Sequence, residues 1–209
     1  KNRLFPDSRP HVSMPNYMSF DLQAVKSKGR SYMANFRLGF EKVLHNEGGY
    51  KLHHVAGDRG GLTFAGISAN AHPQWLGWRL LKNHGSEGQQ DTQLIELVFN
   101  FYRYNFWKKI NGDMITSQKV AESLFDFAVN TGLSTAVKLA QVVVDATPDG
   151  IVGPITLSKL NEYNEYNESL FVSHYALAKI TRYAKIVTNN ENQNKFLLGW
   201  INRTLQGLA

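Results

Sequence analysis

The 209-residue sequence contains no cysteine, which excludes both a disulfide framework and a thiolate metal site. It also lacks any apolar run approaching the roughly 20 residues that a membrane-spanning helix needs. Charged residues make up only 19% of the chain, whereas 43% of the residues are apolar and 12% are aromatic. This composition is typical of a folded globular protein, and the length fits one ordinary domain or two small ones.

A formal net charge of +6 predicts attraction to an anionic partner such as nucleic acid, a membrane surface or the cell wall. The Lys and Arg residues are dispersed, without the dense basic stretch of a nucleic-acid footprint. A generally positive, solubilising surface is an equally good interpretation.

The first 34 residues differ from the rest of the chain. They contain Pro6, Pro10 and Pro15, show little periodicity and lack the apolar core of a signal peptide. We therefore expect an extended arm or linker over residues 1–34 and one domain over residues 35–209.

Helical periodicity dominates from residue 36 onward and predicts a mainly α fold. Residues 48–74, rich in Gly and His, predict irregular structure or a small β-hairpin. Ser134 is placed to cap a helix, and Pro154 to begin a short one. The other expected helices cover residues 36–47, 91–110, 117–130, 134–146, 167–188 and 195–206.

Glu47 occupies an unusual position in the first of these helices. At about 100° per residue, it lies about 20° from Phe36, within the apolar stripe that includes Phe40 and Val43. A glutamic acid in a partly apolar setting keeps its proton more readily, which suits a general acid for glycosidic cleavage. The alternative is a frayed helix end from which Glu47 turns into solvent or pairs with Lys51.

Asp58 and Thr63 follow Glu47 in a glycine-rich segment. Glycosidases need two carboxylates at the scissile bond, or one acid and a group that holds water. A carboxylate and a hydroxyl at these positions predict a pair that holds a nucleophilic water, and Gly60 and Gly61 allow close approach of a sugar. The alternative for Asp58 is a turn residue paired with its neighbour.

Three further residues are candidates for substrate binding. Asp126 and Asn130 share one helix face at the edge of the apolar stripe, where they either line a cleft or serve structure, Asp126 in an ion pair and Asn130 at the helix end. Tyr50 either stacks on a sugar ring or closes its loop over the core. We expect Tyr104 and Trp107 to pack in the core.

The histidines do not indicate a metal site. His53 and His54 are adjacent, and the sequence has no His-Glu-x-x-His motif. We therefore expect no catalytic metal and no cofactor.

Several segments form an ordered series, and together they resemble the N-acetylmuramidases of glycoside hydrolase family 108. The resemblance covers residues 36 to about 206, and the matches in register are more specific than any single motif. Its last segment belongs to the predicted peptidoglycan domain of that family, here about residues 140–209. The segments are EGGY (47–50), Asp-x-Gly-Gly-x-Thr (58–63), Gly66-Ile67, YNFWKKINGD (104–113), DFAVNTG (126–132) and DGIVGPIT (149–156).

The resemblance implies a mostly helical, lysozyme-like enzyme that cleaves the β-1,4 bond between N-acetylmuramic acid and N-acetylglucosamine in peptidoglycan. It makes Glu47 the proton donor, and the set of Glu47, Asp58 and Thr63 looks like the catalytic triad of phage-type lysozymes. The interval from Glu47 to Asp58 is longer here than in the family pattern, which bears on the role of Asp58.

The family resemblance also sets expectations for partners. These are peptidoglycan glycan strands, with an immunity protein or secretion machinery in some biological contexts. We expect a monomer, no nucleic acid and no stable membrane insertion. Action would take place in the bacterial periplasm or cell wall, after secretion or phage-mediated release.

Two other functions compete with muramidase activity. A lytic transglycosylase uses one Glu and forms a 1,6-anhydro end without water, which leaves Asp58 and Thr63 without a role. A non-catalytic peptidoglycan-binding module has no need for an acid on an apolar face. A basic nucleic-acid-binding domain is a third, weaker alternative.

Overall fold

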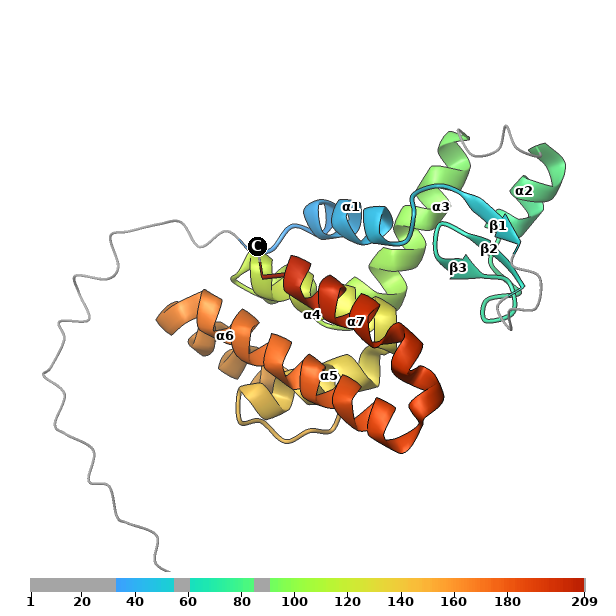
Figure 1. The fold of residues 1–209 in the computed structure, drawn as a ribbon. Coiled ribbons are helices and arrows are strands. Elements are labelled where there is room, and N and C mark those ends of the chain that lie inside the picture. Colours follow the sequence, from blue (N-terminus) through green and yellow to red (C-terminus); the bar gives the residue numbers. More distant parts are fainter. Residues whose placement is uncertain (1–32, 55–60, 85–90, 209) are drawn as a thin grey trace, which may run out of the picture. The chain divides into compact units, whose positions relative to one another are not determined.

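The computed structural model describes residues 33–54, 61–84 and 91–208. The expected arm at residues 1–34 therefore lies almost wholly outside the described part, and its boundary stays a prediction. The rest is mainly helical with one small sheet, as the sequence predicts (Figure 1). Among the described residues, no helix combines the length and apolar character required to cross a membrane.

Helix α1 (Phe36–Asn46) begins after Asn35, whose side chain accepts a hydrogen bond from the Arg37 N–H and so caps the helix. Phe36, Phe40 and Val43 are buried on one face, which confirms the predicted apolar stripe. The helix ends at Glu47, before a glycine pair in the left-handed region.

A three-stranded antiparallel sheet follows α1, in the order β1 (Leu52–His54), β2 (Leu62–Phe64) and β3 (Ile67–Ser68). Phe64 pairs with Leu52 on one side and with Ile67 on the other. Phe64 and Ile67 are fully buried, so the sheet contributes to the core. Of the two expectations for residues 48–74, irregular structure or a small β-hairpin, the described part has the antiparallel pairing of a hairpin, extended by a third strand.

Two helices and a π-helical turn come next: α2 (Gly77–His84), α3 (Thr92–Tyr102) and η3 (Arg103–Trp107). The sequence pattern does not predict α2, and it predicts one regular helix up to residue 110 where the structure has α3 and η3. The π-turn changes the helical register after Tyr102. Trp107 is fully buried as expected, whereas Tyr104 is 60% exposed, so its predicted core position is wrong.

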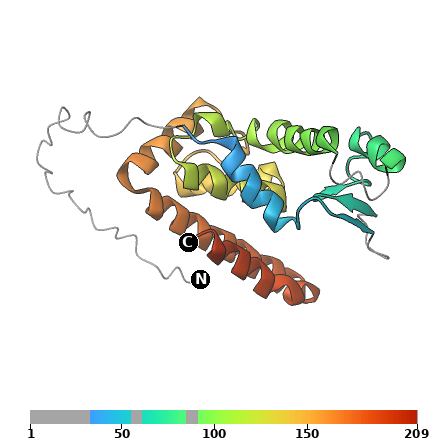
Figure 2. The same ribbon diagram turned by 90° about the horizontal axis from the view of Figure 1, so that it is seen from above.

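The remaining helices follow the 3₁₀ turn η4 (Gly112–Met114). They are α4 (Gln118–Thr131), α5 (Leu133–Val143), α6 (Pro154–Asn189) and α7 (Asn194–Gln206), the last two joined through η5 (Glu191–Gln193). Both views show α6 and α7 side by side (Figures 1 and 2). α6 is kinked at Asn167, which explains why the sequence predicts two helices there.

One expected cap is wrong. α5 begins at Leu133, immediately after Gly132, so Ser134 lies inside the first turn and does not cap the helix. Gly132 has a φ of 89° and separates α4 from α5 by a single residue.

An aromatic cluster joins α1 to the helices around it. The Phe36 ring lies 4.7 Å from that of Phe99, 5.6 Å from that of Trp107 and 5.9 Å from that of Phe125, measured between centroids. The Trp107 indole N–H also donates to Asp113 at 2.8 Å. These contacts fix α1 against α3, η3 and α4. They thereby also fix the position of Glu47 at the C-terminus of α1.

Candidate functional site

Glu47 is held at the C-terminus of α1. Its backbone N–H donates to the carbonyl of Val43 at 2.9 Å, so the helix does not fray before it. Its side chain is 22% exposed, between the buried stripe of α1 and solvent. The expected alternative of an ion pair with Lys51 is wrong, because the carboxylate pairs with Arg203 instead.

Arg203, in the last turn of α7, connects Glu47 to Asp126 of α4. Its Nη2 lies 3.0 Å from Glu47 Oε1 and 2.9 Å from Asp126 Oδ1, while its Nε donates to Asp126 Oδ2 at 3.2 Å. Asn46 adds a hydrogen bond from its Nδ2 to Asp126 Oδ1 at 3.0 Å. Three helices therefore meet in one polar cluster.

The turn between β2 and β3 covers the other side of Glu47. Gly66 has a φ of 77°, and a Cβ at this position would lie 3.0 Å from both Cβ and Cγ of Glu47 and 2.5 Å from Tyr102 Oη. The Tyr102 hydroxyl donates to the carbonyl of Ala65 at 2.8 Å and so fixes the turn. Glu47 thus lies where the sheet meets the helices.

Tyr102 keeps its proton in this setting. Burial raises the pKa of its hydroxyl, the Glu47 carboxylate raises it further, and Arg203 acts in the opposite direction. The hydroxyl is therefore a donor to the Ala65 carbonyl throughout the physiological pH range.

The second half of the predicted triad is only partly described. Asp58 lies outside the described residues. Thr63 lies in β2, opposite His53 on one side and Ser68 on the other, and is half-buried. Within the described part, no hydrogen bond joins Thr63 to Glu47, so the structure leaves the water-holding role of Asp58 and Thr63 as a prediction.

The predicted substrate-binding residues have different surroundings. Asp126 is in an ion pair, which was one of its two expected roles. Asn130 is exposed one turn further along α4. Tyr50 is half-buried, with its ring 6.4 Å from that of Phe64, so it packs towards the core while part of it stays accessible.

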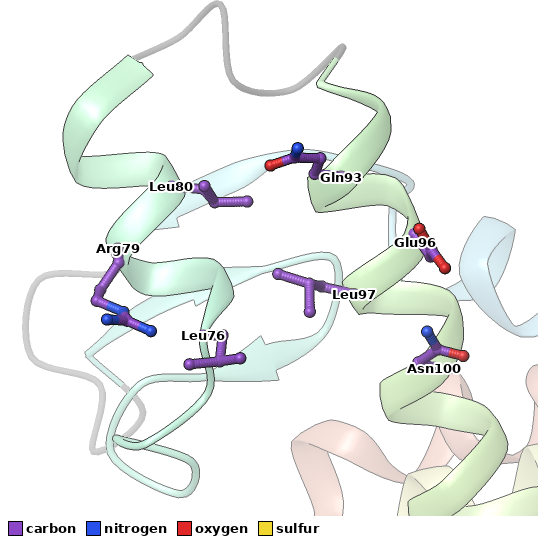
Figure 3. A pocket seen from close by; sticks show the side chains of 7 residues that line it. All are labelled: Leu76, Arg79, Leu80, Gln93, Glu96, Leu97 and Asn100. Carbon is purple, nitrogen blue, oxygen red and sulfur yellow. The ribbon is translucent and has the colours of Figure 1, made fainter.

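Hollows in the described part of the surface differ in the residues that line them. A groove of about 550 Å³ between α2 and α3 contains none of the predicted site residues, and its lining is shown in Figure 3. A larger hollow of about 900 Å³ is lined by residues of α1, α4, α6 and α7, including Asn46, Asp126 and Arg203. The Asp126–Arg203 pair therefore lines this hollow, and Arg203 also contacts Glu47.

Lys179 of α6 lies in the lining of the larger hollow, although the residue is only 6% exposed. Its Nζ donates to Ser123 Oγ at 3.0 Å and lies 4.5 Å from the centroid of the Tyr175 ring. Burial lowers the pKa of this ammonium group to about 8, an effect that Asp126 opposes and Arg203 reinforces. The charge is thus retained at neutral pH at a cost in stability.

The lowered pKa of Lys179 predicts that the stability of the protein depends on pH. The folded-state pKa is below the ordinary value for Lys, so the unfolded chain binds more protons between about pH 8 and 10, and stability rises with pH in that window. The stability advantage of Lys179→Met over wild type should shrink by on the order of 3 kcal/mol across it. Urea unfolding at pH 7, 8, 9 and 10 measures this.

The exposed residue Lys185, on the same helix, provides the control. Lys185→Met should differ from wild type by the same amount at every pH. A constant difference between Lys179→Met and wild type over this range would contradict the account of Lys179.

Comparisons with known proteins agree with this architecture. The family model for glycosyl hydrolase 108 matches residues 40–132, and the model for the Predicted Peptidoglycan domain matches residues 135–205. SagA of Brucella abortus has a similar solved structure, with 25% sequence identity and a TM-score of 0.60, over 83% of this chain and 91% of that one. No curated protein matches the chain significantly by sequence.

Proposed function

The chain belongs to the glycosyl hydrolase 108 family, and from this premise we propose that Glu47 is the general acid with which it cleaves the β-1,4 bond between N-acetylmuramic acid and N-acetylglucosamine. The family and its peptidoglycan domain make the chain a peptidoglycan hydrolase. The observation that supports Glu47 is its place at the end of α1, half-buried, between the β2–β3 turn and α4.

The geometry of the carboxyl group suits proton donation. Arg203 binds Oε1, which leaves Oε2 as the oxygen to carry the proton that goes to the glycosidic oxygen. The glycosidic C–O bond breaks as this proton is transferred, and a water molecule supplies the oxygen at the new reducing end. We propose that Asp58 and Thr63 hold that water, and that Tyr50 and Asn130 contact the glycan.

The products distinguish this function from its enzymatic rival. Digestion of purified sacculi should release fragments with a reducing N-acetylmuramic acid end, because water adds across the bond. A lytic transglycosylase would release 1,6-anhydro ends, about 18 Da lighter by one missing water, and mass spectrometry separates the two. Anhydro ends as the main product would overturn hydrolysis and remove the role of Asp58 and Thr63.

Action on peptidoglycan takes place at the cell wall, and the route to it stays a prediction. A phage endolysin, a secretion-associated muramidase and a toxic effector would all reach peptidoglycan, through phage-mediated release or secretion machinery. Only the effector would need an immunity protein as a partner. We also propose a monomer, which light scattering of the purified protein tests.

A further inference from the structure

Arg203 belongs to the peptidoglycan domain, yet it contacts the candidate acid of the hydrolase domain. It lies within residues 135–205, whereas Glu47 and Asp126 lie within residues 40–132. The contact spans 156 positions in the chain. A module that only tethered the enzyme to its substrate would have no need for such a contact.

We propose that Arg203 is a positioning residue for peptidoglycan cleavage, through which the C-terminal domain orients the Glu47 carboxyl group. This inference rests on the proposed role of Glu47 as the acid. It assigns the C-terminal domain a part in the cleavage step itself, besides any part in binding the wall.

Asp126 fixes the orientation of the Arg203 guanidinium. Nε and Nη2 bind the two oxygens of Asp126 at 3.2 and 2.9 Å, in the two-point geometry that suits Arg and carboxylate. Asn46 holds Asp126 in turn. The second hydrogen of Nη2 is then left for Glu47 Oε1 at 3.0 Å, so the direction of this bond is set by α4 and α7 together.

The charges explain how a cation next to Glu47 is compatible with acid catalysis. An arginine alone would favour the ionised carboxylate, which cannot donate a proton. Asp126 neutralises Arg203, and both side chains are about three-quarters buried, with 24% and 22% of their surface exposed. The pair therefore presents Glu47 with a hydrogen-bond donor of little net charge, which fixes one oxygen of the carboxyl group.

The charged and titratable groups around Glu47 in the described part are Arg203 of α7, Asp126 of α4 and Tyr102 of α3, with Lys179 of α6 acting on the first two. Removal of the Arg203 charge leaves the negative charge of Asp126 near the Glu47 carboxyl group. Removal of the Asp126 charge leaves the positive charge of Arg203 there. The two changes act in opposite directions.

The test compares Arg203→Met and Asp126→Asn with wild type on soluble glycan-strand fragments. We expect kcat to fall by about 10- to 100-fold in Arg203→Met, as for a misplaced catalytic group, with a much smaller change in KM. The alkaline limb of the pH–rate profile should move to higher pH in Arg203→Met and to lower pH in Asp126→Asn. A purely structural role would not produce opposite shifts.

Lys42→Met is the matched control, because Lys42 forms another α1–α4 ion pair, with Glu122. It should leave kcat and the pH profile unchanged. Should Arg203→Met not fold, Arg203→Lys keeps a charge without the planar two-point geometry and should still lower kcat.

Wild-type kcat and an unshifted pH profile in a folded Arg203 variant would overturn the inference. So would shifts of the Arg203→Met and Asp126→Asn profiles in the same direction. Full activity of Glu47→Gln would instead overturn the proposed function, so the two failures are distinguishable.

Discussion

Replacement of Glu47 by Gln should lower the rate of peptidoglycan cleavage by about 10²- to 10⁴-fold, the range typical for loss of a general acid. The amide has nearly the same shape as the carboxyl group, and its oxygen can still accept the hydrogen bond from Arg203 Nη2. It has no acidic proton to give to the glycosidic oxygen. The fold and the binding of sacculi should therefore survive while cleavage is lost.

Glu41→Gln provides the control for this experiment. Glu41 lies on the same helix, six positions before Glu47, but on its exposed face. Glu41→Gln should therefore leave the rate of peptidoglycan cleavage unchanged. Release of soluble fragments from sacculi gives the rate, and a sedimentation assay gives the binding. Similar rates of cleavage for Glu47→Gln and Glu41→Gln would show that Glu47 has a structural role and is not the proton donor.

The second large effect is expected from Gly66→Ala, with a fall in kcat of about 10²-fold. The added methyl group would lie 2.5 Å from Tyr102 Oη, closer than real Cβ atoms come, and 3.0 Å from Glu47 Cβ and Cγ, which is a tight contact. Either the β2–β3 turn or the Tyr102 side chain has to move, and Glu47 has to shift by a few tenths of an ångström. Movement of the turn breaks the hydrogen bond from Tyr102 to the Ala65 carbonyl, so both responses disturb the site.

Gly132→Ala separates this steric effect from backbone strain. Gly132 also has a positive φ, of 89°, but no described atom outside its own chain neighbours lies within 4 Å of an added Cβ. Gly132→Ala should lose about 1–3 kcal/mol of stability from backbone strain alone, because its φ of 89° and ψ of 148° lie in a region that essentially only glycine occupies. Only Gly66→Ala should lose activity. Equal activities of the two folded variants would contradict the placement of Gly66 against Glu47.

The local part of the site could be predicted from the sequence. The 3.6-residue period places Glu47 on the stripe of Phe36, Phe40 and Val43, and the two glycines after it predict the end of α1. The Gly- and His-rich composition that follows predicts irregular structure or a small β-hairpin, and the structure has a small three-stranded sheet there. These features depend on neighbours within a few positions, which a single sequence records directly.

The contact with Arg203 could not be predicted in this way. An arginine in the last turn of a helix is typical of any surface helix, because it interacts favourably with the helix dipole. Its partners lie 77 and 156 positions away, and helical periodicity contains no information on which helices meet. For the same reason, the sequence predicts that Asp126 lies at the edge of the apolar stripe of α4 but does not identify Arg203 as its partner. Both substrate binding and an ion pair therefore stay open for Asp126 from the sequence alone.

The errors elsewhere also have physical causes. The backbone leaves the regular α-helical pattern after Tyr102, and in the π-helical turn η3 Tyr104 is exposed while Trp107 is buried. The single-residue break at Gly132 starts α5 at Leu133, two residues earlier than a cap at Ser134 would. In both places a local irregularity of the backbone overrides the regular pattern.

The most direct test of the central claim, that Glu47 donates the proton, compares two leaving groups in Glu47→Gln. A 4-nitrophenyl glycoside of a muropeptide releases a stable phenolate and needs no proton, whereas the natural glycan releases a sugar alkoxide that does. The variant should lose about 10²- to 10⁴-fold on the natural glycan and far less on the activated glycoside. Equal losses on both substrates would show that Glu47 does not act as the proton donor.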